Sequence, residues 1–196
     1  MTSGLVYRAV IEKERNLKYG GKDVQMMTDV PDEVLRRLEA LAENARTDFV
    51  LIEVGGTAGD NENLVFLEAA RVLKLTRPGD VLFVLVSYLP VLGNVGEMKT
   101  KPTQHAVRAL SSVGINTDMI IARAPVPLDH PRKEKISRIC SIKPEDVISA
   151  PDVFSIYEIP INFERDMIGK RILERFGMSV RKHDSTAWQE LVSSIR

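Results

Sequence analysis

Residues 81–104 of this 196-residue chain read VLFVLVSYLPVLGNVGEMKTKPTQ. The apolar run Val81–Val86 predicts a buried strand, a glycine-bearing loop spans residues 93–98, and Lys101–Ser112 has a helical pattern. Two lysines and a glutamine amide, within Lys99–Gln104, are therefore expected where a strand is followed by a helix. In an open parallel sheet ligands bind at that point, and helix amides and lysines attract phosphate. A solvated basic turn is the alternative interpretation.

A second glycine-bearing loop, EVGGTAGDNE at residues 53–62, follows Asp48–Ile52, which predicts another buried strand because residues 49–52 are apolar. Glu53, at the end of that strand, resembles the acidic residue that holds Mg²⁺ in nucleotide enzymes. Asp60 and Glu62 can accept hydrogen bonds from sugar hydroxyls or base amides. The alternative is a plain turn in which Asp60 caps the next helix, and the two roles are compatible.

Apolar strands and amphipathic helices alternate along the chain. Strands are expected at Val24–Met27, Asp48–Ile52, Val81–Val86, Met119–Ala122 and Val147–Ser149. Helices are expected at Leu5–Arg15, from Pro31 to Ala42, and at Leu64–Leu73, Lys101–Ser112, Arg132–Cys140, Val153–Glu158, Glu164–Phe176 and Ser185–Ser194. This alternation predicts an α/β fold with a mostly parallel sheet and helices on both faces. Residues 181–196 are interpreted as a linker and a C-terminal helix.

The composition narrows the classes of function. With 27 Lys and Arg against 27 Asp and Glu the formal net charge is zero, which disfavours nucleic-acid and membrane-surface partners. The single cysteine, Cys140, suits a reducing compartment. No apolar run approaches the length of a membrane span and no signal peptide opens the chain, so we expect a cytoplasmic protein.

Several stretches together resemble the amidoligase (synthetase) domain of the CTP synthase family. They are Ile11–Arg15, Glu53–Thr57 with Gly59–Asp60, Lys99–His105, and Ser155–Tyr157 with Ile159–Pro160, in the family's order and spacing. The resemblance implies a Rossmann-like fold of the P-loop NTPase and dethiobiotin synthetase type, with residues 1–180 as a partial amidoligase domain. The family's first strand, phosphate loop, first metal-binding aspartate and C-terminal glutaminase domain have no counterpart in this sequence.

The resemblance also assigns roles to individual residues. The implied contacts to UTP, or to CTP as feedback inhibitor, are Asp60, Glu62, Lys99, Thr100, Lys101, Pro102, Thr103, Gln104 and Lys135. Lys99 and Lys101 would also serve catalysis, Arg123 would lie near the phosphates of the co-substrate ATP, and Glu53 would bind Mg²⁺. The chain departs from the family at Ile139, where a phenylalanine is usual, and at Thr28–Asp29, where Pro-His is typical.

The family reaction phosphorylates the 4-oxygen of UTP with ATP, and ammonia from glutamine then displaces the phosphate to give CTP. Our leading interpretation is a CTP synthase segment that retains most of the pyrimidine-nucleotide site. The alternatives are a non-catalytic nucleotide-binding or oligomerisation module, and a dethiobiotin synthetase-type ligase with another substrate. We expect the chain alone to be inactive, and to form a homo-oligomer, as the family tetramer does, or to pair with a chain that supplies the phosphate loop. Ammonia would come from a glutaminase domain or from solution.

Overall fold

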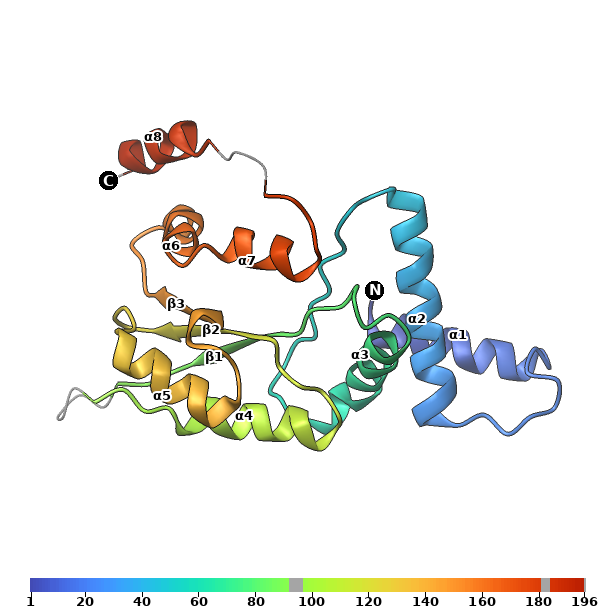
Figure 1. The fold of residues 1–196 in the computed structure, drawn as a ribbon. Coiled ribbons are helices and arrows are strands. Elements are labelled where there is room, and N and C mark those ends of the chain that lie inside the picture. The colour runs from blue at the N-terminus through green and yellow to red at the C-terminus, as the bar shows by residue number, and fades with distance from the viewer. Residues whose placement is uncertain (92–96, 181–183, 196) are drawn as a thin grey trace. The chain divides into compact units, whose positions relative to one another are not determined.

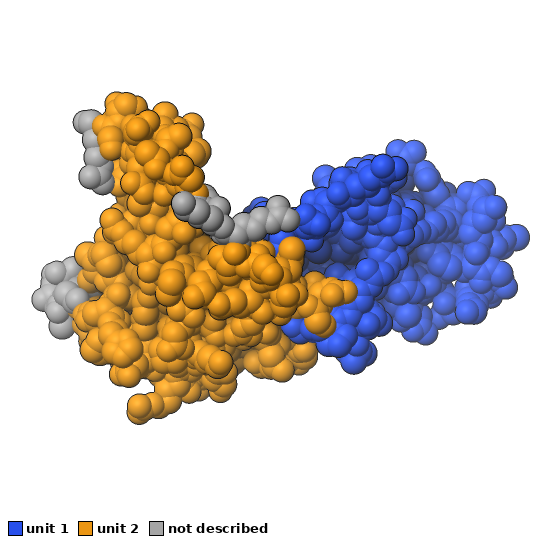
Figure 2. All heavy atoms as spheres, turned by 45° about the horizontal axis from the view of Figure 1, so that its top comes forward, with its two compact units in different colours: residues 1–78 blue, residues 79–196 orange. Residues whose placement is uncertain are grey.

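The computed structural model describes residues 1–91, 97–180 and 184–195, and it divides into two compact units. Unit 1 comprises Met1–Pro78 and unit 2 comprises Gly79–Arg196, shown in separate colours in Figure 2.

Unit 1 is helical in its described elements. These are α1 (Ser3–Arg15), α2 (Met26–Ala45), the short 3-10 helix η1 (Asn61–Asn63) and α3 (Leu64–Thr76). Its core is an aliphatic cluster of Val6, Val10, Val30, Val34, Val65 and Ala69, which come from α1, α2 and α3. The three helices are therefore held together by the apolar stripes that the sequence predicts for them.

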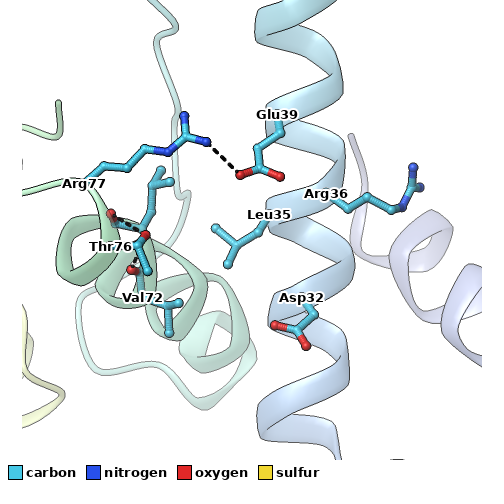
Figure 3. Close-up of a pocket in the computed structure, with 8 residues that line it drawn as sticks. Asp32, Leu35, Arg36, Glu39, Val72, Thr76 and Arg77 are labelled. Atoms are coloured by element: carbon cyan, nitrogen blue, oxygen red, sulfur yellow. Dashed lines mark hydrogen bonds and ion pairs between the residues drawn. The ribbon is translucent and has the colours of Figure 1, made fainter. Parts of the chain in front are cut away.

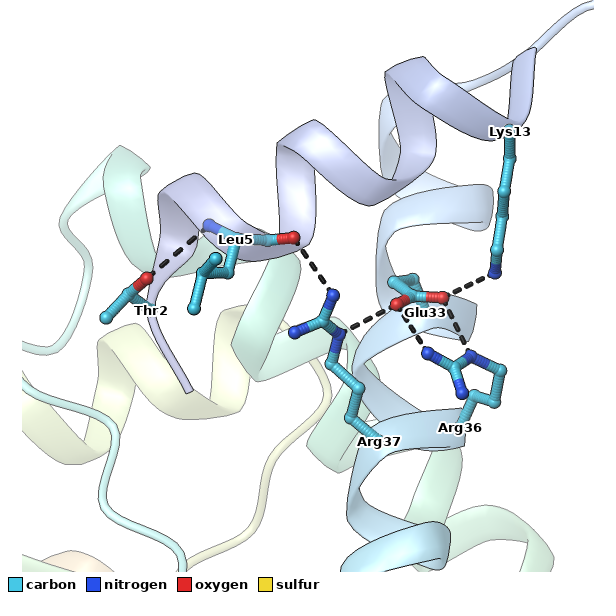
Figure 4. A network of polar contacts seen from close by, with 6 residues as sticks. All are labelled: Thr2, Leu5, Lys13, Glu33, Arg36 and Arg37. Carbon is cyan, nitrogen blue, oxygen red and sulfur yellow. Dashed lines mark hydrogen bonds and ion pairs between the residues drawn. The ribbon is translucent and has the colours of Figure 1, made fainter. Parts of the chain in front are cut away.

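One carboxylate is buried between α1 and α2. The Glu33 side chain is 1% exposed and accepts bonds from Lys13 Nζ (2.5 Å), Arg36 Nη2 (2.8 Å) and Arg37 Nε (2.7 Å), as Figure 4 shows. Arg37 also donates to the Leu5 carbonyl oxygen. The bond from Arg36, with those from Lys13 and Arg37, holds the pKa of Glu33 well below its usual range although burial acts in the opposite direction. This network joins the two helices.

Two predicted strands of unit 1 are wrong. Residues 24–27 do not form a strand, because α2 already begins at Met26, five residues before the expected start at Pro31. The Asp29 carboxylate accepts a bond from the Gln25 amide at 2.7 Å, which satisfies an orphan donor at the start of this helix. Residues 48–52 are also not a strand, and Leu51 is 96% exposed. The sheet that the described residues form has three strands, and this segment is not one of them.

Unit 2 contains a three-stranded parallel sheet in the order β1 (Val84–Tyr88), β2 (Met119–Ala124) and β3 (Val147–Pro151). Val84 pairs with Met119, and Ile120 pairs with Val147. Strand β1 begins three residues later than predicted. The Phe83 amide donates instead to the Asp118 carboxylate at 2.8 Å.

Helices cover both faces of this sheet (Figure 1). They are α4 (Lys101–Ser112) and α5 (His130–Cys140) on one face, and α6 (Ile159–Arg165) and α7 (Ile168–Arg175) on the other. The short 3-10 helices η2 (Pro144–Asp146) and η3 (Ile156–Glu158) and the C-terminal helix α8 (Thr186–Ile195) complete the unit. The predicted α/β class with a parallel sheet is therefore confirmed.

The C-terminal half of unit 2 differs in detail from the prediction. The helix expected over Glu164–Phe176 is two helices, separated at Met167 by a left-handed backbone with φ of 54°. Of the helix expected over Val153–Glu158, only η3 forms. Helix α8 is present as predicted, whereas residues 181–183 of the expected linker lie outside the described residues.

Cys140 belongs to the core of unit 2. It is 6% exposed, at the end of α5, and burial raises the pKa of its thiol. None of the helices in the described ranges combines the length and the apolar character that crossing a bilayer requires.

Candidate functional site

The segment Lys99–Gln104 lies at the carboxyl edge of the sheet in unit 2, as predicted. Lys99 lies beside the residues that follow β1, because its amide donates to the Pro90 carbonyl oxygen at 2.8 Å. Val91 and Met98 form an antiparallel bridge next to this hydrogen bond. Residues 93–96 of the predicted loop lie outside the described residues. Because the strands are parallel, the loops after β1 and β2 open at the same edge.

Two threonines fix the start of α4. Thr103 is fully buried, and its hydroxyl lies 2.9 Å from the hydroxyl of Ser87 in β1. Thr100 is also buried, and its hydroxyl accepts a bond from the Gln104 side-chain amide at 3.0 Å. In contrast, Lys101 and Pro102 are exposed in the first turn. The first turn of α4 is therefore held by the buried side chains of Thr100 and Thr103, and it leaves Lys101 exposed.

Positive charges gather around one carboxylate at this edge. Lys99 Nζ donates to Glu97 Oε2 at 2.6 Å. This bond and the charge of Lys99 lower the pKa of Glu97, and Lys135 and Arg132 of α5 add to the effect. Two segments that are more than thirty residues apart in the sequence, at the starts of α4 and α5, thus contribute to one cationic cluster, defined here as Lys99, Arg132 and Lys135.

Lys135 also lines an open hollow of about 340 Å³ on α5. The other lining residues are Pro131, Glu134, Arg138 and Ile139. Lys135 and Ile139 are four residues apart on a helix, so their side chains lie on one face. The structure thus places the departure at Ile139 beside the lysine that the resemblance assigns to the nucleotide.

Arg123 lies near the end of β2, and its guanidinium is 3.8 Å from the Asp152 carboxylate. Both side chains are more than half exposed, which makes this a weak surface pair. The position of Arg123 is compatible with the predicted contact to ATP phosphates, which stays a prediction.

Asp60 and Glu62 belong to unit 1. The Asp60 carboxylate accepts a bond from the Thr57 amide at 3.0 Å, so it closes its own loop and makes no side-chain cap on the helix that follows. Gly56 has φ of +88°, and a Cβ there would lie 2.6 Å from the Asn63 side chain. Asp60 and Glu62 are both exposed at the start of η1 and α3. The glycine therefore serves the loop that presents these two carboxylates.

Glu53 is exposed in a segment without secondary structure. The described residues contain no group of three or more His, Cys, Asp or Glu side chains that could hold a metal ion. Mg²⁺ in nucleotide enzymes needs only one or two carboxylates, because substrate phosphates and water fill its other positions. Glu53 fits that limited role, and Mg²⁺ binding stays a prediction.

Another open hollow, of about 400 Å³, lies between α2 and α3 within unit 1 (Figure 3). Its walls include Leu35 and Val72, and an ion pair between Glu39 and Arg77 of 3.0 Å. None of the predicted site residues lines it.

Sequence reasoning missed the roles of Glu97, Arg132 and Lys133. Arg132 stands one helical turn before Lys135, and that spacing could have indicated a shared helix face. Glu97 stands two residues before Lys99, which would place both on one side of an extended segment. Lys133 is one of several charged residues in α5. Its side chain is only 16% exposed and bonds to Asp166, which no local pattern reveals because the partner is 33 residues away.

Comparison with known proteins agrees with the resemblance. The family model described as CTP synthase N-terminus matches residues 1–178. Over 197 aligned positions the chain is 44% identical to the CTP synthase of Pyrococcus abyssi, 41% to that of a Picosynechococcus strain and 42% to that of Methanothermobacter thermautotrophicus. Each match covers 100% of this chain but only 36% or 37% of the relative, so the chain spans little more than a third of their length. The chain belongs to the CTP synthase family.

Proposed function

We propose that this chain is the pyrimidine-nucleotide-binding part of a CTP synthase, which aminates UTP to CTP with ATP and glutamine or ammonia. The observation that carries the proposal is the turn Lys99–Gln104 at the carboxyl edge of the parallel sheet, where buried threonines fix the start of α4 and Lys101 is exposed. Triphosphates carry several negative charges, and positioned lysines and arginines neutralise them. The family membership supports the choice of UTP and CTP as ligands.

Each predicted residue has a chemical role in this proposal. Lys99 and Lys101 would bind phosphate oxygens and neutralise charge that develops in phosphoryl transfer. Asp60 and Glu62 would accept bonds from the sugar or the base. Thr100, Pro102, Thr103 and Gln104 would shape the turn that holds the lysines, and Lys135 would contact the nucleotide from α5. Arg123 would face the phosphates of ATP, and Mg²⁺ would be held by Glu53 together with those phosphates.

A non-catalytic nucleotide-binding or oligomerisation module is the second candidate. It is favoured by one feature of the sequence: residues 1–196 contain no phosphate loop of the Walker type, since Met98 stands where that pattern needs a glycine before the lysine. Both candidates predict binding of pyrimidine nucleotides, and they differ in turnover. Pairing with a chain that carries the loop would reconcile the first candidate with the sequence, whereas homo-oligomerisation would complete only a nucleotide site that is shared between copies. We also propose a cytoplasmic location, which the single buried Cys140 suits.

Calorimetric titration of the full chain tests nucleotide binding. UTP and CTP should bind more tightly than ATP and GTP. The substitution Lys99→Ala should weaken UTP binding by about 10- to 100-fold, the range for loss of a hydrogen bond from a charged group. Lys170→Ala is a matched control, because Lys170 is an exposed lysine of unit 2 that pairs within α7. Equal affinity for purine and pyrimidine triphosphates would overturn the proposal.

A turnover assay tests whether the chain is active by itself. The purified chain would be given UTP, ATP, Mg²⁺ and ammonium, with the Glu53→Gln variant as the blank. We expect no CTP above the blank, since phosphoryl transfer needs a cradle for the γ-phosphate. A CTP peak that disappears in the variant would show that the chain is an enzyme by itself.

A further inference from the structure

Helix α5 is attached to the sheet by a half-buried ion pair. Lys133 Nζ donates to Asp166 Oδ1 at 2.6 Å, and the two side chains are 16% and 20% exposed. The other oxygen of the same carboxylate, Oδ2, accepts the backbone amide of Ser149 in β3 at 2.6 Å. One carboxylate between α6 and α7 therefore holds both a lysine of α5 and the backbone of β3.

A second contact secures the loop that enters α5. The Ser149 hydroxyl accepts a bond from the Leu128 amide at 3.0 Å. Ser149 thus contacts the loop through its side chain and Asp166 through its amide. The start of α5 is fixed to β3 both at the loop and one turn into the helix.

Lys133, which forms the ion pair, lies on the side of α5 opposite to Lys135. Successive residues of a helix turn by about 100°, so Lys133 and Lys135 point about 200° apart. Lys133 bonds to Asp166, and Lys135 contributes to the positive potential at Glu97. A rotation of α5 about its axis would move both side chains together. The anchor at Lys133 therefore acts together with the buried Ile136 and Cys140 to determine where Lys135 points.

We propose that Lys133 and Asp166 are positioning residues for the nucleotide site, because their ion pair sets the rotation of α5 and so the place of Lys135. The proposal rests on the proposed function, in which Lys135 contacts UTP. The alternative explanation is simple electrostatic attraction, in which the positive charge of Lys133 attracts the phosphates of UTP at long range. The two explanations predict opposite results for one substitution.

Titration of the full chain with UTP would compare wild type with Lys133→Met and Asp166→Asn. Asn keeps an oxygen for the Ser149 amide but loses the charge that holds Lys133. Positioning predicts that both variants bind UTP about three- to tenfold more weakly, as for residues coupled through one network, with unchanged binding stoichiometry. Long-range charge predicts weaker binding for Lys133→Met but tighter binding for Asp166→Asn, and that result would overturn the proposal. Unchanged affinity in both variants would overturn it as well.

Two further variants serve as controls. Lys133→Arg keeps a donor and a charge, and it should restore most of the affinity. Glu174→Gln removes one negative charge from an exposed pair within α7, and it should leave UTP affinity unchanged. Failure of Lys133→Arg to restore binding, or an equal loss in Glu174→Gln, would contradict positioning by this pair.

Amide hydrogen exchange gives a readout that needs no nucleotide. The amides of residues 130–137 should exchange faster in Asp166→Asn and Lys133→Met than in Glu174→Gln, at equal global stability. Unchanged exchange in α5 would overturn the inference by itself. Absence of UTP binding by the wild-type chain, in contrast, would overturn the proposed function, so the two failures are distinguishable.

Discussion

The hydroxyl oxygens of Ser87, in β1, and Thr103, in α4, lie 2.9 Å apart in the interior of unit 2. This bond joins β1, an edge strand of the sheet, to α4, the helix whose first turn carries Lys101. Both hydroxyls are buried, so neither can turn to bulk water if its partner is removed.

Breaking this bond from one side should destabilise unit 2. Ser87→Ala leaves the Thr103 hydroxyl buried without its partner, which should cost about 1–3 kcal/mol in the free energy of unfolding. The double variant Ser87→Ala with Thr103→Val should recover part of that loss, because no polar group is then orphaned. Urea denaturation of wild type, Ser87→Ala, Thr103→Val and the double variant measures the coupling. Strictly additive losses would show that the two hydroxyls act independently.

Gly56 should tolerate no side chain. Its φ of +88° and the 2.6 Å approach to the Asn63 side chain predict that Gly56→Ala destabilises unit 1 by more than about 1 kcal/mol. Gly55→Ala is the matched control, since a Cβ at Gly55 meets nothing within 4 Å. Thermal unfolding followed by circular dichroism should show a lower transition temperature only for the Gly56 variant. The same variant should bind UTP more weakly if the loop presents Asp60 as proposed.

Glu33 should make unit 1 sensitive to acid. The pKa of Glu33 is lowered in the folded chain, chiefly by the bond from Arg36, from an ordinary value of 4.5. Its contribution to stability is therefore fully present above that value and is lost as pH falls toward the folded pKa. Glu33→Gln should cost about 1.5–3 kcal/mol at pH 7, the range for hydrogen bonds to charged groups.

The difference between wild type and Glu33→Gln should then narrow progressively below about pH 4.5, the ordinary value from which the folded pKa is lowered. Denaturant unfolding at several pH values measures it. A difference that stays constant down to pH 3 would contradict the predicted linkage.

Glu97 should weaken nucleotide binding by competing with the phosphates for Lys99. The two side chains form an exposed ion pair, so a nucleotide phosphate must compete with the carboxylate for the lysine. Glu97→Gln should tighten UTP binding by less than about fivefold, as expected for an exposed pair. The control is the double variant Glu97→Gln with Lys99→Ala, which should bind no better than Lys99→Ala alone. Weaker binding by the Glu97 variant would instead assign the carboxylate to ligand contact.

Glu53 should couple nucleotide binding to Mg²⁺. If it supplies a carboxylate to the metal, Mg²⁺ should strengthen UTP and ATP binding, and Glu53→Gln should abolish most of that gain. Titrations with and without the metal measure the gain directly. If the gain persists in the variant, Glu53 has no part in metal binding.

The sequence predicted the elements that carry their own local signals. The helices near Leu5–Arg15 and Lys101–Ser112 were found because their apolar residues recur at helical spacing, and the strand at Met119 was found because it is apolar throughout. The strands expected at Val24 and Asp48 failed because a short apolar run does not specify a partner. The break at Met167 gave no signal, since the left-handed position holds no glycine.

The candidate site could be predicted in its residue types but not in its internal bonds. The lysines of Lys99–Gln104 were identified from their place after a strand, and the structure puts Lys99 next to Pro90, just beyond the end of β1. The bond from Gln104 to Thr100 and the pair Lys133–Asp166 depend on how segments pack. Asp60 and Glu62 lie in unit 1, so their meeting with Lys99 stays a prediction.

The burial of Cys140 has a practical consequence for experiments on this protein. The chain has one cysteine, its thiol is buried, and its raised pKa leaves little of the reactive thiolate at neutral pH. A cysteine introduced on the surface would therefore react with a maleimide dye far faster than Cys140. A pair of fluorescent labels could be attached, one to α5 and one to the 53–62 loop, without first removing the native thiol, and the distance between them could be followed as nucleotides are added.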